Sequence, residues 1–269
     1  PTTDNFALKV DYNIDNSTKL TSITTKRKHT DKAVIDADFS QITQRHLYKD
    51  FKFNTLSQEL RYEKIITDTK IVTGVYLDKE DNDIYIKALT PLDPTGANSK
   101  LQNLSSNSIG VFGSIIHPLN DKWTINIGMR YDKENKEMNV EKTNINLDES
   151  WGNISPKLSM QYTIDEKSIS YLTIAKGYRA GGFNPYAADN KKSYDEESLV
   201  SDELGYKGMF AKNTIKFNTS VYYMKIDDMQ VEESLTPGVI YMVNATSATS
   251  KGIEVEFEAL LNNEFTLFS

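Results

Sequence analysis

Residues 123–131 read WTINIGMRY, a run in which large apolar side chains alternate with polar or small ones. Successive side chains of a β-strand point to opposite faces of the sheet, so a period of two sorts residues into two faces. The run therefore predicts a β-strand with one apolar and one polar face. The apolar face consists of Trp123, Ile125, Ile127, Met129 and Tyr131, and the polar face of Thr124, Asn126, Gly128 and Arg130.

The same alternation recurs on both sides of this run, in residues 6–14, 157–164 and 253–259. In the last segment Ile253, Val255 and Phe257 alternate with Glu254, Glu256 and Glu258. Burying unpaired charges is costly, so the glutamate face must meet water. A soluble β-sandwich would turn that face outward, whereas a membrane β-barrel would turn it toward the lumen and the apolar face toward lipid.

Extended along the chain, the pattern predicts an all-β fold of about twelve antiparallel strands. A further short pair is expected around residues 84–86, inside a long connection. The predicted strands lie near residues 5–14, 18–27, 54–66, 69–79, 106–117, 121–133, 153–164, 168–177, 199–210, 213–227, 243–260 and 264–269.

Short and long connections alternate between these strands. Short turns are marked by residues 15–17, 67–68, 120–121, 165–166, 212–213 and 262–263, and long polar connections by residues 28–53, 80–105, 133–150, 178–198 and 230–241. In an up-and-down antiparallel barrel this order places the short turns at one rim and the long loops at the other. Outer-membrane barrels have this asymmetry, with short periplasmic turns and long extracellular loops. The sequence therefore favours a transmembrane β-barrel.

Composition excludes several other classes of protein. Of the 269 residues, 38% are hydrophobic and 26% are charged, and no run reaches the ~20 apolar residues of a membrane-spanning helix. The formal net charge of -7 argues against nucleic acid as a partner, because binding phosphates needs a basic face. The chain has no cysteine, which removes disulfides and thiol chemistry.

Residues with the pattern of a catalytic or metal site are not found in the sequence. The three histidines, His29, His46 and His117, are scattered without the spacing of metal ligands. No pair of carboxylates and no serine has a placement that argues for acid–base or nucleophilic catalysis. We therefore expect no enzymatic activity, no resident metal and no cofactor.

Residues 175–185 read AKGYRAGGFNP and resemble a hallmark of TonB-dependent outer-membrane receptors, in which such a strand leaves the membrane and opens an extracellular loop. Other segments resemble strands of the same family and follow the family's order between residues 54 and 260. These segments are LSQELR (56–61), SPKL (155–158), ELGYKG (203–208), YY (222–223), DMQ (228–230), NA (244–245) and GIEVE (252–256).

The resemblance implies a barrel of about 22 strands in the outer membrane of a Gram-negative bacterium. It also implies a plug domain in the lumen, which binds TonB through an N-terminal box. Residues 1–269 are then expected to be part of the barrel domain, without the plug or the final strands. Such a part should form an open sheet, with no hydrogen-bond ladder between residues 5–14 and 264–269. The implied partners are a ferric siderophore as cargo, the TonB complex by way of the plug, and outer-membrane lipid.

The loop opened by this motif holds the residues best suited to binding such a cargo. A ferric siderophore is bulky and often anionic; arginine offers fork-shaped donors, and aromatic side chains offer flat faces. The candidate ligand-binding residues are Tyr178, Arg179, Phe183, Asn184 and Tyr186. The alternative is that the motif only maintains strand geometry. Gly181 and Gly182 are expected to allow a sharp exit from the membrane with φ above zero.

Other cargoes and other functions stay open. Haem is disfavoured because no histidine lies between residues 118 and 269, whereas cobalamin, nickel complexes and oligosaccharides remain candidates. A plug-less passive channel or a structural barrel is the alternative membrane function, and a plug with a TonB box ahead of Pro1 would exclude it. A soluble all-β carbohydrate-binding protein is the third alternative, which monomeric folding without detergent would favour.

Overall fold

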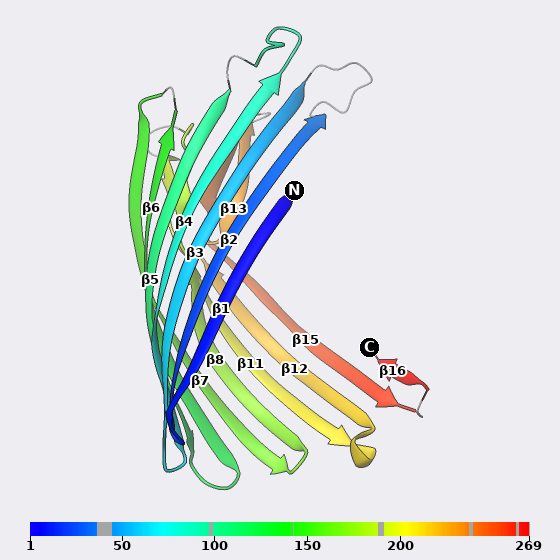
Figure 1. Ribbon diagram of the computed structural model, residues 1–269. Helices are drawn as coiled ribbons and strands as arrows, with labels where there is room; N and C mark the ends of the chain where they lie inside the picture. Colours follow the sequence, from blue (N-terminus) through cyan, green and yellow to red (C-terminus); the bar gives the residue numbers. More distant parts are fainter. Residues whose placement is uncertain are drawn as a thin grey trace.

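The computed structural model describes residues 1–36, 45–96, 99–141, 143–187, 191–236, 239–261 and 264–268. Twelve strands form one antiparallel sheet that follows the order of the chain (Figure 1). The strands are β1 (Thr2–Asp15), β2 (Thr18–Asp36), β3 (His46–Ile66), β4 (Thr69–Leu89), β5 (Lys100–Pro118), β6 (Trp123–Val140), β7 (Ile145–Asp165), β8 (Ser168–Arg179), β11 (Glu197–Phe210), β12 (Ile215–Asp227), β15 (Ser247–Leu260) and β16 (Thr266–Phe268). The all-β, up-and-down architecture expected from the sequence is confirmed.

Two small hairpins lie outside the large sheet. One lies within the predicted connection 178–198, and the other begins in the predicted connection 230–241 and extends to Asn244. β9 (Gly182–Phe183) pairs with β10 (Ser193–Tyr194), and β13 (Gln230–Thr236) pairs with β14 (Val239–Asn244). The strand predicted over residues 243–260 is confirmed as β15, but its predicted start is four residues too early. Its first residues end β14, and β15 begins only at Ser247, because the chain must turn from the hairpin back into the large sheet.

The short turns lie together at one end of the sheet, at the bottom of Figure 1. Polar side chains close several of them. Asp15 accepts a hydrogen bond of 2.7 Å from the N–H of Ser17, and a 3-10 turn, Ala211–Asn213, joins β11 to β12. The predicted asymmetry of the two rims is confirmed, while the turn predicted at residues 262–263 lies outside the described residues.

The strands near the loop end are longer than the sequence pattern predicts. β3 begins at His46, β4 continues to Leu89, and β6 and β7 are joined through residues 141–144 alone. The long connections predicted at 28–53, 80–105 and 133–150 are thus wrong for most of their length, and the separate pair at 84–86 is part of β4. Where both faces of a strand meet water, the backbone ladder continues although the apolar alternation ends.

The sheet is curved, so one of its faces is concave and the other is convex. Arg130 of β6 lies 5.4 Å from the ring centre of Tyr76 on β4, two strands away, which places both side chains on the concave face. Met129 points the other way and is 59% exposed. This agrees with the orientation predicted for β6, with the Arg130 face toward the lumen and the Met129 face toward lipid.

The same polar and apolar faces continue through the paired strands from β8 to β15. Glu254 and Glu256 line a hollow together with Tyr171 and Lys207 of β8 and β11, on the polar side of the sheet. Ile253 lies on the opposite side, in a row of four paired apolar residues. That row consists of Leu172, Leu204, Val221 and Ile253.

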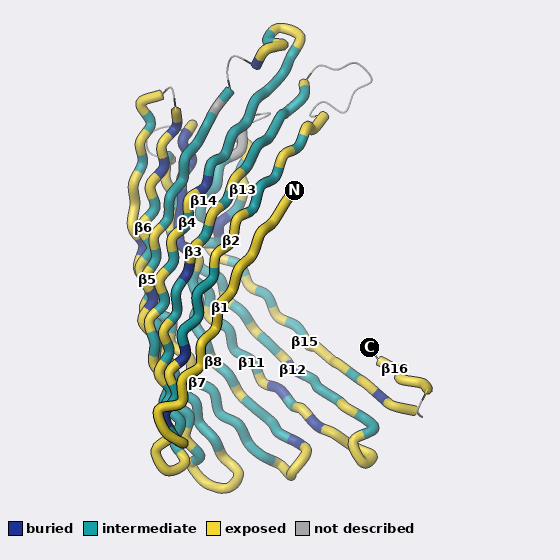
Figure 2. Tube along the Cα trace, viewed as in Figure 1, coloured by how far each residue is buried: buried dark blue, intermediate teal, exposed yellow. Residues whose placement is uncertain are grey.

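The sheet is open between its first and last strands. Over the described ranges β1 pairs with β2 alone and β16 with β15 alone, so the predicted absence of a ladder between the two ends is confirmed. Figure 2 shows that β1 is exposed along its whole length, as befits an edge strand. The described residues contain no helix that is long and apolar enough to cross a membrane.

Candidate functional site

A cavity of about 440 Å³ opens on the concave face, toward the loop end of the sheet. Strands β4, β5, β6 and β8 form its wall, and the two small hairpins contribute one residue each. The lining residues are Tyr76, Ser108, Arg130, Asp132, Glu134, Lys136, Tyr178, Arg179, Ala180, Tyr194 and Gln230. Because these residues are far apart in the sequence, the cavity exists only in the folded chain.

Strand β6 lines the cavity with four charged side chains at every second position. Arg130 forms an ion pair of 2.6 Å with Asp132. Lys136 forms one of 3.0 Å with Glu134 and donates a hydrogen bond of 2.8 Å to the carbonyl of Gly181. These four charges therefore cancel in pairs, and Lys136 ties the loop after β8 to the wall.

Arg179 differs from the other two cations of the cavity. Its side chain is exposed and makes no hydrogen bond or ion pair with any residue in the described part of the chain. Among the lining residues it is the one charge without a counter-charge. A guanidinium presents planar, fork-shaped donors that match carboxylate and other anionic oxygen groups. The cavity is thus suited to an anionic ligand.

Two phenols stand beside this charge, above the outward apolar residues of β8, which end at Ile174. Burial, reinforced by the carboxylates of Asp132 and Glu134, raises the pKa of Tyr178 to about 12. Burial also raises the pKa of Tyr194, and the charge of Arg179 opposes that rise. Both hydroxyls therefore stay protonated at neutral pH and can donate hydrogen bonds to a ligand.

The loop after β8 is fastened to the second hairpin by a buried amide. The side-chain nitrogen of Asn184 donates to the carbonyls of Met242 (2.8 Å) and Lys191 (3.1 Å), and its oxygen accepts the N–H of Met242 (2.9 Å). Phe183 packs against Trp151, with ring centres 6.1 Å apart. Both residues hold the loop in place.

Of the five candidate residues, the structure brings Tyr178 and Arg179 together at the cavity. Phe183 and Asn184 lie deeper in the loop and make the contacts within the protein described above. Tyr186 is 40% exposed and accepts a hydrogen bond of 3.3 Å from the side chain of Gln102 on β5.

Several lining residues were not among the sequence candidates. On β6 a signal was present: the polar positions that begin at Thr124 continue with the period of two through Arg130 to Lys136. For Tyr76, Tyr194 and Gln230 there was none, because only the curvature of the sheet and the docking of the hairpins bring them to the cavity.

Comparison with known proteins accounts for this architecture. The family model described as TonB dependent receptor-like, beta-barrel, matches residues 1–269. The chain belongs to this family. Its members are transporters and receptors of the Gram-negative outer membrane, and every residue of the chain falls in their barrel domain.

Solved structures of the family share the fold at low sequence identity. The ferric yersiniabactin uptake receptor FyuA from Yersinia pestis superposes with a TM-score of 0.80 at 18% identity, covering 97% of this chain and 40% of that one. The siderophore receptor PiuA from Acinetobacter baumannii gives 0.77 at 14%, covering 97% and 44%. The copper transporter OprC gives 0.77 at 13%, also covering 97% and 44%. The chain thus spans less than half the length of these proteins.

The glycines of the receptor's GYRAGGFN motif serve close packing. The expectation of positive φ at Gly181 and Gly182 is wrong: Gly96 is the one glycine with positive φ in the described ranges. A Cβ at Gly181 would lie 2.1 Å from the carbonyl oxygen of Tyr194 and 2.6 Å from the indole of Trp151. At Gly182 it would lie 2.4 Å from the hydroxyl of Tyr194. Only glycine lets the loop approach β10 and Trp151 this closely.

Gly181→Ala is therefore expected to displace the loop and to destabilise it by about 1–3 kcal/mol, as overpacking typically does. Gly177→Ala is the matched control, because its Cβ would meet Leu199 at an ordinary 3.9 Å. Fluorescence of Trp151, in a full-length background in which every other tryptophan is replaced by phenylalanine, should shift to longer wavelength in the first variant only. Equal spectra for the two variants would contradict the packing argument.

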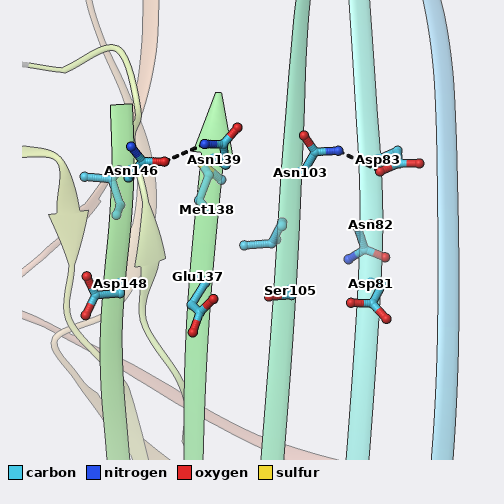
Figure 3. A pocket seen from close by; sticks show the side chains of 12 residues that line it. Asp81, Asn82, Asp83, Asn103, Ser105, Glu137, Met138, Asn139, Asn146 and Asp148 are labelled. Carbon is cyan, nitrogen blue, oxygen red and sulfur yellow. Dashed lines mark hydrogen bonds between the residues drawn. The ribbon is translucent and has the colours of Figure 1, made fainter. Parts of the chain in front are cut away.

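A second hollow of about 440 Å³ lies across strands β4 to β7 near the loop end, and carries amides and carboxylates (Figure 3). Asp81, Ser105, Glu137 and Asp148 form one row, and above it the side chain of Asn103 donates to Asp83 at 2.9 Å. In the part of the chain that the structure describes, no three His, Asp or Glu residues come close enough to hold a metal ion. We assign no function to this hollow.

Proposed function

We propose that the protein takes up a ferric siderophore across the outer membrane, driven by TonB. The observation that carries the proposal is the cavity on the concave face, where Arg179, which has no ion-pair partner among the described residues, stands beside the phenols of Tyr178 and Tyr194. Membership of the TonB-dependent receptors supports the transport mechanism. FyuA and PiuA, which share the fold, are described as receptors for ferric yersiniabactin and for a siderophore.

The chemistry of the cavity fits an iron chelate with anionic oxygen atoms. Arg179 would bind such oxygen atoms through paired N–H donors. The protonated hydroxyls of Tyr178 and Tyr194 would donate further hydrogen bonds, and their rings would pack on flat parts of the chelate. Phe183 and Asn184 would contribute indirectly, by holding the loop. Tyr186 lies at the exposed side of the same loop and would meet the cargo as it enters.

Transport of this kind needs a plug and a TonB box in the same protein. We therefore expect uptake to require TonB and the proton gradient of the inner membrane. A passive channel would work without either. Uptake that persists in a strain without TonB would replace the proposal by the channel function.

The decisive experiment deletes the gene of the whole protein and compares growth on a panel of single iron sources. We expect growth to fail on one ferric siderophore or on a group of related ones. Failure on cobalamin or on an oligosaccharide as the limiting nutrient, with normal growth on every iron source, would assign a different cargo.

Arg179→Ala in the complemented strain should weaken binding of the selected chelate by about 10- to 100-fold, the usual loss for a hydrogen bond to a charged group. Lys167→Ala, in the turn between β7 and β8, removes one positive charge at the opposite rim and should leave binding unchanged. Equal effects of the two variants would show that Arg179 acts through overall charge and not by contact.

A further inference from the structure

Gln230, the first residue of β13, lies between the segment that follows β8 and the segment that follows β10. It lines the cavity, yet its side chain is only 7% exposed. The side-chain nitrogen donates to the carbonyl of Ala180 at 2.9 Å and to the carbonyl of Asp195 at 3.1 Å. One amide group therefore joins two backbone segments that lie 15 residues apart in sequence.

These two carbonyls belong to the residues that directly follow the cavity's ligand groups. Ala180 comes after Arg179, and Asp195 comes after Tyr194. Gln230 is itself fixed, because its backbone N–H donates at 2.7 Å to the carboxylate of Glu197 at the start of β11. The two segments are already paired through Gly182 with Tyr194 and through Arg179 with Glu197, and the amide adds a side-chain link beside the two ligand groups.

We propose that Gln230 is the positioning residue that sets the spacing between Arg179 and Tyr194, and thereby the shape of anionic group that the cavity accepts. The proposal rests on the proposed function, in which these two side chains bind the cargo. Gln230 need not touch the cargo itself. A carboxamide is required, because both of its N–H groups donate to carbonyls, and only a side chain of this length reaches both.

The electrostatic relation between Arg179 and Tyr194 offers a test that needs no cargo. The positive charge of Arg179 favours the phenolate of Tyr194, so Arg179→Ala should raise the pKa of Tyr194. The full-length receptor would carry 3-fluorotyrosine at position 194, and its pKa would be followed by fluorine NMR. In the native background we expect an upward shift on Arg179→Ala. In a Gln230→Met background that shift should become clearly smaller, because the segments then keep only their strand pairing, Gly182 with Tyr194 and Arg179 with Glu197.

Gln102→Met is the matched control. Gln102 also binds the loop after β8, through the hydroxyl of Tyr186, whereas the carbonyls of Ala180 and Asp195 accept their side-chain hydrogen bonds from Gln230. The shift on Arg179→Ala should persist in the Gln102→Met background. A shift of undiminished size with Gln230→Met would overturn the positioning role, whatever the cargo proves to be.

A second measurement uses the chelate that the growth panel selects. Arg179→Ala and Tyr194→Phe should act on its affinity non-additively in the native background, because both side chains would bind one anionic group. With Gln230→Glu the affinity should fall about tenfold or more, since a carboxylate repels both carbonyls, and the two effects should become additive. Unchanged non-additivity in Gln230→Glu would refute the inference, whereas no loss from Arg179→Ala would refute the proposed function instead.

Discussion

Met129→Arg is expected to destabilise the folded barrel by about 2–4 kcal/mol, the loss observed for a basic residue at the midplane of a lipid-facing strand. Met129 lies on the convex face near the middle of the outward apolar residues of β6, which run from Trp123 to Tyr131 with Ile127 at their centre. Its row continues through Gly113 on β5 and Pro156 on β7, neither of which offers a partner to an arginine. Urea unfolding of the full-length receptor in lipid vesicles measures the loss.

Ser114→Arg provides the control at the same height. Ser114 neighbours Gly113 in the chain but points to the concave face, beside Gly128, where a charged side chain can reach water. We expect a much smaller loss for this variant. Equal losses would show that both faces of the sheet are shielded from water at this height, contrary to the assignment of one face to lipid and the other to the lumen.

The sequence allowed this orientation to be predicted because the physical cause is local. Lipid on one side and water on the other impose the period of two, and WTINIGMRY displays it without any knowledge of the neighbouring strands. The same local cause explains where the prediction of strand ends failed. Beyond the membrane Lys79 and Asp81 of β4 both lie on the convex face, so the alternation disappears although the ladder to β3 and β5 continues.

The candidate site was predictable only in part, for a different reason. The GYRAGGFN motif marks the end of β8 and the loop after it, and the end of β8 does supply Tyr178 and Arg179 to the cavity. The other lining residues reach the cavity because the sheet is curved and because the two small hairpins pack beside it. Tyr76 reaches Arg130 because the sheet bends, and Tyr194 and Gln230 arrive on separate hairpins. No spacing in the sequence encodes these contacts.

The glycines illustrate the same limit. A pair of adjacent glycines is compatible with a turn at positive φ and with a close approach of two segments. Gly181 and Gly182 belong to the second kind, since β10 and Trp151 fill the space that a Cβ would need. The residues that decide between these two roles come from other parts of the chain, so the motif alone does not identify them.

Asn184→Ala should release the loop after β8 from the second hairpin. Asn184 is 7% exposed, and its removal leaves the N–H and the carbonyl of Met242 without their partner. Each buried backbone group left unsatisfied costs about 1–3 kcal/mol. Local opening of this region should therefore become at least about tenfold more frequent. Hydrogen exchange of the Met242 amide in the full-length receptor measures that frequency directly.

Asn139→Ala separates this effect from the loss of any side-chain amide near the loops. The amide of Asn139 donates to Asn146, its exposed neighbour on β7, and water can replace that partner. Exchange at Met242 should then match the native receptor, while Asn184→Ala accelerates it and weakens cargo binding in parallel, because the same loop carries Arg179 at its start. If Asn184→Ala accelerated exchange and left cargo affinity unchanged, Arg179 would be held by β8 and Gln230 alone. If exchange at Met242 stayed slow, the two loops would be joined by contacts other than this amide.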